Sequence, residues 1–98
     1  MRVISVKALR LFWEKYPDAE QYLKVWNKKI KEATYKNANE VRNETPTADH
    51  VGNNRVVFNI AGNKYRLIVL FRYDLQKAYI RFVGTHKEYD QIKDIKNI

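Results

Sequence analysis

Two stretches in the first third of the chain carry apolar side chains at the spacing of an α-helix. Residues 2–5, which are partly β-branched, come before them and are predicted to form a short strand. The two apolar series are Val6, Leu9, Phe12, Trp13 and Tyr16, then Ala19, Tyr22, Leu23, Trp26, Ile30 and Ala33. Pro17-Asp18 separates them, and proline is tolerated in the first turn of a helix. The pattern therefore predicts two amphipathic helices joined by a tight turn.

The second half of the chain changes to the pattern of β-strands. Residues 35–54 are polar and irregular, although residues 39–44 are compatible with a single helical turn. Three β-rich runs then follow, at residues 55–60, 64–73 and 77–83. The segments between these runs are short enough for hairpins, so the three strands are expected to be neighbours in one sheet.

The charged end of the chain, residues 86–97, places Tyr89, Ile92 and Ile95 at helical spacing and predicts a closing helix. The expected order is β-α-α-β-β-β-α, and without a linker or repeat we assign residues 1–98 to one domain. Amphipathic helices must bury their apolar faces. We therefore expect an α+β fold in which an antiparallel sheet carries the two N-terminal helices on one face.

Alternation along the three runs divides the expected sheet into two different faces. Side chains of a strand alternate between the faces, so the register depends on whether both hairpin loops hold an even number of residues. With even loops, one face is wholly apolar or aromatic: Val56, Phe58, Ile60, Tyr65, Leu67, Val69, Phe71, Tyr73, Ala78, Ile80 and Phe82. We predict that this face packs against the helices and forms the core.

The opposite face is basic. It carries Arg55, Val57, Asn59, Lys64, Arg66, Ile68, Leu70, Arg72, Tyr79, Arg81 and Val83, with no acidic residue. An ordinary solvated sheet face would also carry carboxylates, and the chain as a whole has a formal net charge of +8. Such a balance favours a polyanionic partner, and the planar arginine fork suits phosphate. We therefore predict a functional basic face that binds a polyanion, either a nucleic acid, an acidic membrane surface or an acidic protein. A membrane surface is disfavoured because the apolar residues here are interleaved with polar ones.

One histidine stands out as a candidate for chemistry. His86 follows the last predicted strand, after Gly84-Thr85, which places it at the edge of the basic face. Histidine exchanges protons near neutral pH, and Tyr89 would lie close to it on a helix. A lone histidine at a strand end is more often structural than catalytic, so both interpretations stay open on this pattern alone. His50, in the irregular segment, is interpreted as a surface residue without a role.

Several function classes find no support in the sequence. The chain has no cysteine, which removes disulfides, thiolate chemistry and cysteine-ligated zinc. There is no glycine-rich phosphate loop, no HExxH motif and no carboxylate pair, so we expect no metal and no cofactor. No run of about 18 apolar residues could span a bilayer. The N-terminus also lacks the pattern of a signal peptide, which predicts a cytoplasmic protein.

Three blocks of sequence resemble a known family. They read RLFWEKYPDAE at 10–20, RVVFNI with GNKYRL at 55–67, and YIRFVGTH with EYD at 79–90. The blocks cover nearly the whole chain in order, which is more specific than a short motif. They are similar to the HigB toxins within the larger RelE-like group of bacterial toxin–antitoxin systems. The resemblance implies a RelE-like fold, with the helices on one sheet face and an RNA-facing surface on the other.

The resemblance also implies a function and partners. Such toxins are mRNA endonucleases that act on translated messages in the ribosomal A site and thereby inhibit translation. Each is neutralised by a cognate antitoxin, here a HigA-like protein with a helix-turn-helix domain. The complex contacts operator DNA only through that antitoxin.

The chemistry that the resemblance implies needs no metal. The ribose 2′-hydroxyl attacks the adjacent phosphate and leaves a 2′,3′-cyclic phosphate and a 5′-hydroxyl. Carried onto this chain, Arg66 would stabilise phosphate charge and His86 would act as the acid, with Lys64 and Tyr89 as candidates for the base or for base stacking. The residues that would bind and position RNA are Arg55, Arg72, Tyr79 and Arg81.

Two alternatives to the endonuclease remain. A non-catalytic RNA- or ribosome-binding module would use the same basic face, with salt-sensitive binding that survives His86→Ala and with no cleavage. A protein-interaction domain would use the positive charge to bind an acidic partner and would not bind RNA at physiological salt.

Overall fold

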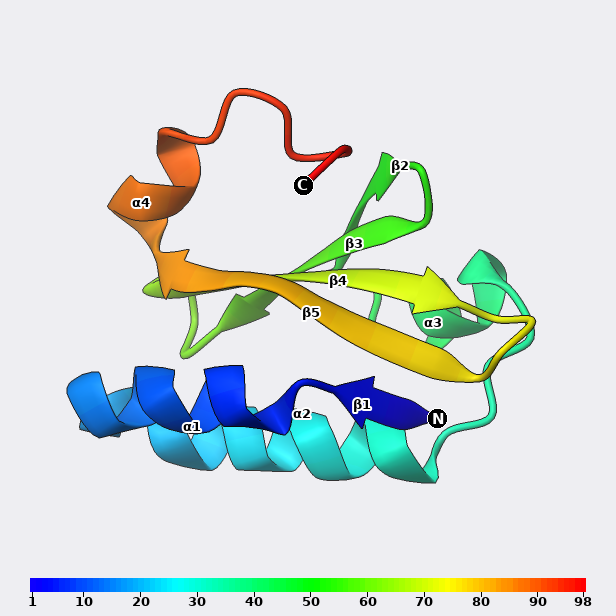
Figure 1. Ribbon diagram of the computed structural model, residues 1–98, viewed down its shortest axis with the longest axis horizontal. Helices are drawn as coiled ribbons and strands as arrows, with labels where there is room; N and C mark the ends of the chain where they lie inside the picture. Colours follow the sequence, from blue (N-terminus) through cyan, green and yellow to red (C-terminus); the bar gives the residue numbers. More distant parts are fainter.

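A five-stranded sheet with two long helices on one of its faces makes up most of the protein (Figure 1). The computed structural model describes residues 1–98. The elements in chain order are β1 (Arg2–Ile4), α1 (Val6–Lys15), the 3₁₀ turn η1 (Pro17–Ala19), α2 (Glu20–Glu32), α3 (Ala38–Glu44), β2 (Asp49–Gly52), β3 (Arg55–Ile60), β4 (Tyr65–Arg72), β5 (Lys77–Thr85) and α4 (His86–Asp90). The predicted α+β fold, with the helices before the main strands, is confirmed.

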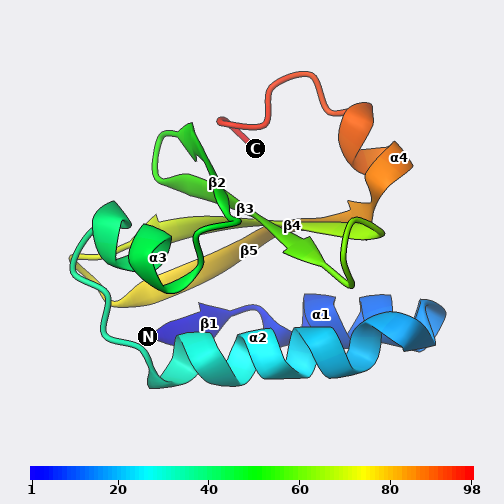
Figure 2. The ribbon, with the colours of Figure 1, turned by 180° about the vertical axis from the view of Figure 1, so that it is seen from behind.

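The two N-terminal helices form where the apolar spacing predicts them. Helix α1 buries Leu9 and Phe12, while α2 buries Leu23, Trp26 and Ile30 in the same core. Burying such a stripe stabilises each helix through packing rather than through its intrinsic propensity. Figure 2 shows both helices in one layer under the sheet. No helix of the protein is both long enough and apolar enough to cross a membrane.

The sheet has the strand order β1-β5-β4-β3-β2. Strands β2 to β5 are antiparallel neighbours, whereas β1 joins the edge of β5 in parallel, so the sheet is mixed. A parallel pair requires a long crossover, which here consists of the helices and the rest of the sheet. The three main strands match their predicted positions closely.

The segment that was expected to be irregular contains two short elements. Asn37 caps helix α3, because its side chain accepts a hydrogen bond from the backbone N–H of Glu40, and the helix buries Val41. Strand β2 pairs with β3 and places Asp49 opposite Val57. Strand β2 was missed because four residues, Asp-His-Val-Gly, are too few to show an alternating pattern.

The register of the two hairpins confirms most of the predicted core face. Both loops hold four residues, because Ile60 pairs with Tyr65 and Arg72 pairs with Lys77. The core contains Val56, Phe58, Ile60, Tyr65, Leu67, Val69, Phe71 and Ala78, with Tyr73 and Ile80 packed against it. Phe82 does not belong to this cluster, and its assignment to the core was wrong.

A β-bulge in β5 explains the error. Ile68 pairs with Phe82 whereas Val69 pairs with Ile80, which leaves Arg81 as an extra residue in β5. One extra residue reverses the alternation beyond it. Val83 therefore packs on the core, and Phe82 moves to the opposite face with Ile68. We call that opposite face, turned away from α1 and α2, the outer face.

The end of the chain differs from the predicted closing helix. Helix α4 ends at Asp90, and residues 91–98 run without regular secondary structure over the outer face (Figures 1 and 2). Ile92, Ile95 and Ile98 are half-buried, while the residues between them are exposed. Their three-residue spacing therefore reflects packing on the sheet and not a helix.

Candidate functional site

The junction between β5 and α4 holds His86 in a defined position. Thr85 and Glu88 form a capping box, in which each side chain accepts a hydrogen bond from the other residue's backbone N–H, at 3.1 Å and 2.8 Å. These hydrogen bonds lower the pKa of Glu88. The backbone N–H of His86 also donates to the main-chain oxygen of Lys64, at 3.0 Å. The turn carrying His86 is therefore fixed both internally and to the residue just before β4.

The side chain of His86 has an orienting partner. Its Nδ1 lies 3.0 Å from Oδ2 of Asp90, one helical turn away, and half of the side chain is exposed. A carboxylate on one ring nitrogen fixes the orientation of the ring. The other nitrogen, Nε2, is left to exchange a proton with a bound molecule. This is the arrangement that a general acid requires.

Arg66 and Tyr89 lie beside this junction. Arg66 pairs with Gly84 across β4 and β5, and its guanidinium carbon lies 5.8 Å from the centre of the Tyr89 ring. Nη1 of Arg66 also donates to the main-chain oxygens of Asn63 and Tyr65. Burial raises the pKa of Tyr89, and the charge of Asp49 adds to this shift. At neutral pH Tyr89 is therefore a hydrogen-bond donor rather than a base.

Phe82 completes the group, although the sequence interpretation had placed it elsewhere. Its ring centre lies 6.5 Å from that of Tyr89, which forms an aromatic pair on the outer face. The ring lies directly over Gly84, because a Cβ at that position would be 2.4 Å from Cζ of Phe82. A glycine inside a strand often marks such a close approach. Gly84 was the signal in the sequence that could have located Phe82.

Adding a methyl group at Gly84 is expected to displace the Phe82 ring. The Gly84→Ala variant should lose about 1–3 kcal/mol of unfolding free energy, which is typical of overpacking. Urea unfolding would measure this loss. Phe82→Leu removes the clashing ring carbons. In that background, Gly84→Ala should therefore lower the unfolding free energy much less than it does in the wild type. Equal losses from Gly84→Ala in both backgrounds would contradict this contact.

Lys64 is not directed toward this group. Its Nζ lies 3.0 Å from Oδ2 of Asp18 in η1, on the helix side of the protein. The other oxygen of Asp18 accepts a hydrogen bond from the hydroxyl of Tyr65, and this contact raises the pKa of Tyr65 to about 12. The Lys64 ammonium is therefore held at a carboxylate on the helix side and not at the β5–α4 junction.

The Asp18 contact should make part of the stability depend on pH. The hydrogen bond from Tyr65, followed by that from Lys64, lowers the pKa of Asp18. The ionised Asp18 carboxylate therefore contributes to the free energy of unfolding. This contribution is fully present above the unfolded-state pKa of about 3.9 and is lost as the pH falls through the lower folded-state pKa. Asp18→Asn should therefore lower the unfolding free energy at pH 7, and the difference from the wild type should shrink below pH 4. A difference that urea unfolding finds unchanged down to pH 2 would argue against this contact.

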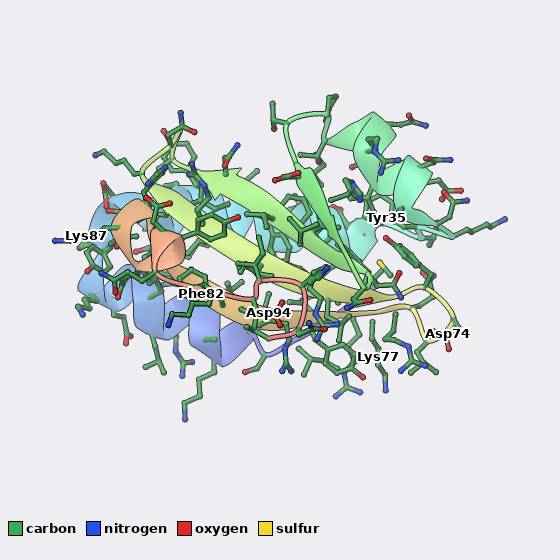
Figure 3. All side chains as sticks on the ribbon, turned by 90° about the horizontal axis from the view of Figure 1, so that it is seen from above. Tyr35, Asp74, Lys77, Phe82, Lys87 and Asp94 are labelled. Carbon is green, nitrogen blue, oxygen red and sulfur yellow. The ribbon has the colours of Figure 1, made fainter.

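Arg72 lies far from His86. Its Nε and Nη2 form a two-point ion pair with Asp74, at 3.1 Å and 2.8 Å, in the hairpin between β4 and β5. Figure 3 shows Asp74 at one end of the sheet and Lys87 of α4 at the other. The structure therefore separates Arg72 from the other candidate residues.

Arg55 and Arg81 converge near the middle of the outer face. Nε and Nη2 of Arg55 lie 3.2 Å and 2.8 Å from the main-chain oxygen of Ile98, and Nε of Arg81 lies 3.1 Å from the same atom. Tyr79 is on this face as well, opposite Leu70. The chain's last residues therefore cover this part of the basic surface (Figure 3).

The outer face is less uniformly basic than the three main strands suggest. Strand β2 adds Asp49, which shares a face with its partner Val57. His50, also in β2 rather than in a loop, is half-buried and lines a cavity of about 300 Å³ with Arg42 and Tyr73. Burial, followed by the charge of Arg42, lowers the pKa of His50, so this histidine is neutral at pH 7.

Comparison with known proteins agrees with the fold and the resemblance. The family described as HigB toxin, the RelE-like toxic component of a toxin-antitoxin system, matches residues 19–92. The chain is 35% identical over 92 residues to the mRNA interferase toxin HigB of Escherichia coli strain K12, covering 92% of this chain and 88% of that protein. The same values hold for the mRNA interferase HigB of Escherichia coli O157:H7 and that of Shigella flexneri. The chain therefore belongs to the HigB family of RelE-like toxins, whose members act as the toxic half of a toxin–antitoxin pair.

Proposed function

We propose that this toxin is a ribosome-dependent mRNA endonuclease that cuts translated messages and so inhibits translation. Its relatives carry the name mRNA interferase. The observation that carries the proposal is the β5–α4 junction, where His86, oriented by Asp90, lies at the edge of a cationic sheet face. Arg66 and Tyr89 are adjacent to this junction.

The proposed reaction is cleavage by the ribose 2′-hydroxyl without a metal ion. A bond forms between the 2′-oxygen and phosphorus, while the bond from phosphorus to the 5′-oxygen breaks. The imidazolium of His86 gives its proton to the 5′-oxygen, and the 2′-hydroxyl proton passes to water. Arg66 stabilises the charge that develops on the phosphate oxygens.

The remaining candidate residues take supporting roles. Tyr89, which stays protonated, donates to the phosphate or stacks with Phe82 against a base. Lys64 is held by Asp18 and contributes positive potential only. Because no side chain here is a strong base, catalysis depends on orientation and charge neutralisation.

RNA binding extends from the junction across the outer face. Arg55, Arg81 and Tyr79 contact the RNA backbone near the centre of the sheet, while Arg72 contributes only at its far end. The cognate antitoxin is a HigA-like protein with a helix-turn-helix domain, and operator DNA is bound through that antitoxin. The toxin acts in the cytoplasm, where translated messages are found.

A reconstituted translation reaction on a defined message tests the function. Primer extension maps the new 5′ ends with wild-type protein, with and without ribosomes. We expect cuts at regular codon positions only in reactions that contain ribosomes. Folded wild-type protein that binds ribosomes without producing cuts would refute the endonuclease and favour the non-catalytic binding module.

A further inference from the structure

The final residues of the chain cover a second apolar surface. Val57 and Ile68 are 3% and 0% exposed, although they lie on the outer face and outside the main core cluster. The elements on that side of the sheet are α4 and the segment 92–98, which we call the C-terminal segment (Figures 1 and 3). This segment turns its isoleucines toward the sheet and keeps Lys93, Asp94, Lys96 and Asn97 exposed.

Polar contacts attach the C-terminal segment to the same face. Besides the contacts of the two arginines with Ile98, Nδ2 of Asn53 donates to the main-chain oxygen of Lys96 at 3.2 Å and to Oδ1 of Asn97 at 2.8 Å. All of the groups that the sheet supplies are donors, and two of them are guanidinium groups directed at one oxygen. Converging guanidinium donors suit an oxygen of a phosphate or of a carboxylate.

We infer that Asn53, Arg55 and Arg81 form a binding subsite for a backbone phosphate of RNA, and that the C-terminal segment occupies this subsite in the free protein. The choice of RNA as the ligand rests on the proposed function. Arg55 directs two of its nitrogens at the Ile98 oxygen, so the segment and a phosphate compete for the same donors. RNA therefore binds fully only after the segment has moved away.

The segment is suited to such an exchange. It has no regular secondary structure, and its attachment consists of three half-buried isoleucines and hydrogen bonds from Asn53, Arg55 and Arg81, so it can detach without unfolding a helix or strand. The segment covers only some of the cations of the basic face, and Arg66, which lies by Tyr89, is outside its contacts. The uncovered cations can attract a polyanion, which then displaces the segment.

A release variant and a lock variant test the inference in opposite directions. In the release variant, Ile95→Ser/Ile98→Ser, the segment loses two apolar contacts while chain length and charge stay the same. In the lock variant, Asn53→Cys/Asn97→Cys, a short cleavable thiol reagent joins two side chains that are in contact. The protein has no cysteine of its own, so only this pair reacts.

Binding is measured by fluorescence anisotropy with a labelled 2′-O-methyl oligoribonucleotide, which lacks the nucleophile and stays intact. If the segment covers the subsite about 90% of the time, release should tighten binding roughly tenfold. The affinity of the release variant should also fall more steeply as salt is added. The slope of log affinity against log salt concentration should grow by about 0.7 for each added phosphate contact on a single strand. The locked protein should bind more weakly than the same protein after cleavage of the reagent. Arg55→Gln should remove the gain in the release variant.

Either variant can overturn the inference. Unchanged RNA affinity in a folded release variant, or in the locked protein, would mean that the segment does not compete with RNA. Tighter binding of an acidic peptide but not of RNA would assign the subsite to a protein partner instead. If the wild type cuts messages but the RNA affinities of the release variant and the locked protein are unchanged, only the inference about the subsite is refuted. Affinities that change as expected without message cutting would refute only the nuclease.

Discussion

Replacing His86 with alanine is expected to abolish message cleavage while leaving the fold intact. General acid catalysis by a positioned side chain contributes typically 10²–10⁴-fold, so the cleavage rate in translation reactions should fall by at least about 100-fold. The side chain is half-exposed, and its backbone N–H still bonds to Lys64 in the variant. Alanine is also a good helix former, which preserves α4.

Asp90→Asn serves as the matched comparison for His86→Ala. This variant keeps the shape of the partner that lies 3.0 Å from the imidazole but removes its negative charge. We expect a smaller loss, of about tenfold, because the ring keeps a partner of the same shape but loses the charge-assisted contact that orients it. Primer extension with equal amounts of each folded variant measures both effects. Cleavage by His86→Ala within about threefold of the wild type would exclude His86 as the acid.

The sequence predicts the helix layer and the core well because long amphipathic patterns carry redundant information. In α1 and α2 several apolar positions repeat the same period, so a single misleading residue does not change the prediction. The core face of β4 is equally clear, since Leu67, Val69 and Phe71 alternate without a break.

Single-residue and tertiary effects lie outside such patterns. The extra residue Arg81 places Phe82 on the outer face and Val83 on the core face. The order of apolar and polar residues in the sequence does not reveal such a bulge. Residues 91–98 have a helical spacing of isoleucines, but these side chains are half-buried in a segment without regular secondary structure that crosses the outer face (Figure 1). Local propensity cannot distinguish these two outcomes, because contacts with the sheet decide between them.

The candidate site was only partly predictable for the same reason. Arg66 and Tyr89 come together near His86 because β4 pairs with β5 and β5 leads directly into α4, a connection that local sequence indicates. Lys64 and Arg72 were expected on the same basic surface, but each pairs with an acidic residue outside the strands. The partner of Lys64, Asp18, is brought to it by the tertiary fold, whereas the partner of Arg72, Asp74, lies two residues away in the hairpin. Charge counts along a strand reveal neither pair.

Replacing Arg66 with glutamine is expected to lower the cleavage rate about 10²–10³-fold, as is usual when one donor to a transition-state oxyanion is lost. Arg72→Gln is the matched control. Both arginines lie on the outer face of β4, and both variants lower the net charge by one, so they change the long-range attraction for RNA almost equally. They differ in position, because Arg66 lies by Tyr89 and Arg72 is paired with Asp74.

The comparison separates a specific catalytic role from general positive potential. If Arg66 acts on the phosphate at the β5–α4 junction, Arg72→Gln should reduce single-turnover cleavage by less than about threefold, the small effect expected for an exposed paired charge. Arg66→Lys should recover only part of the loss, because an ammonium cannot reproduce the planar fork. Equal losses from Arg66→Gln and Arg72→Gln would show that the face acts through its total charge. In that case His86 would have to work without an adjacent phosphate clamp, and the proposed division of roles at the junction would be wrong.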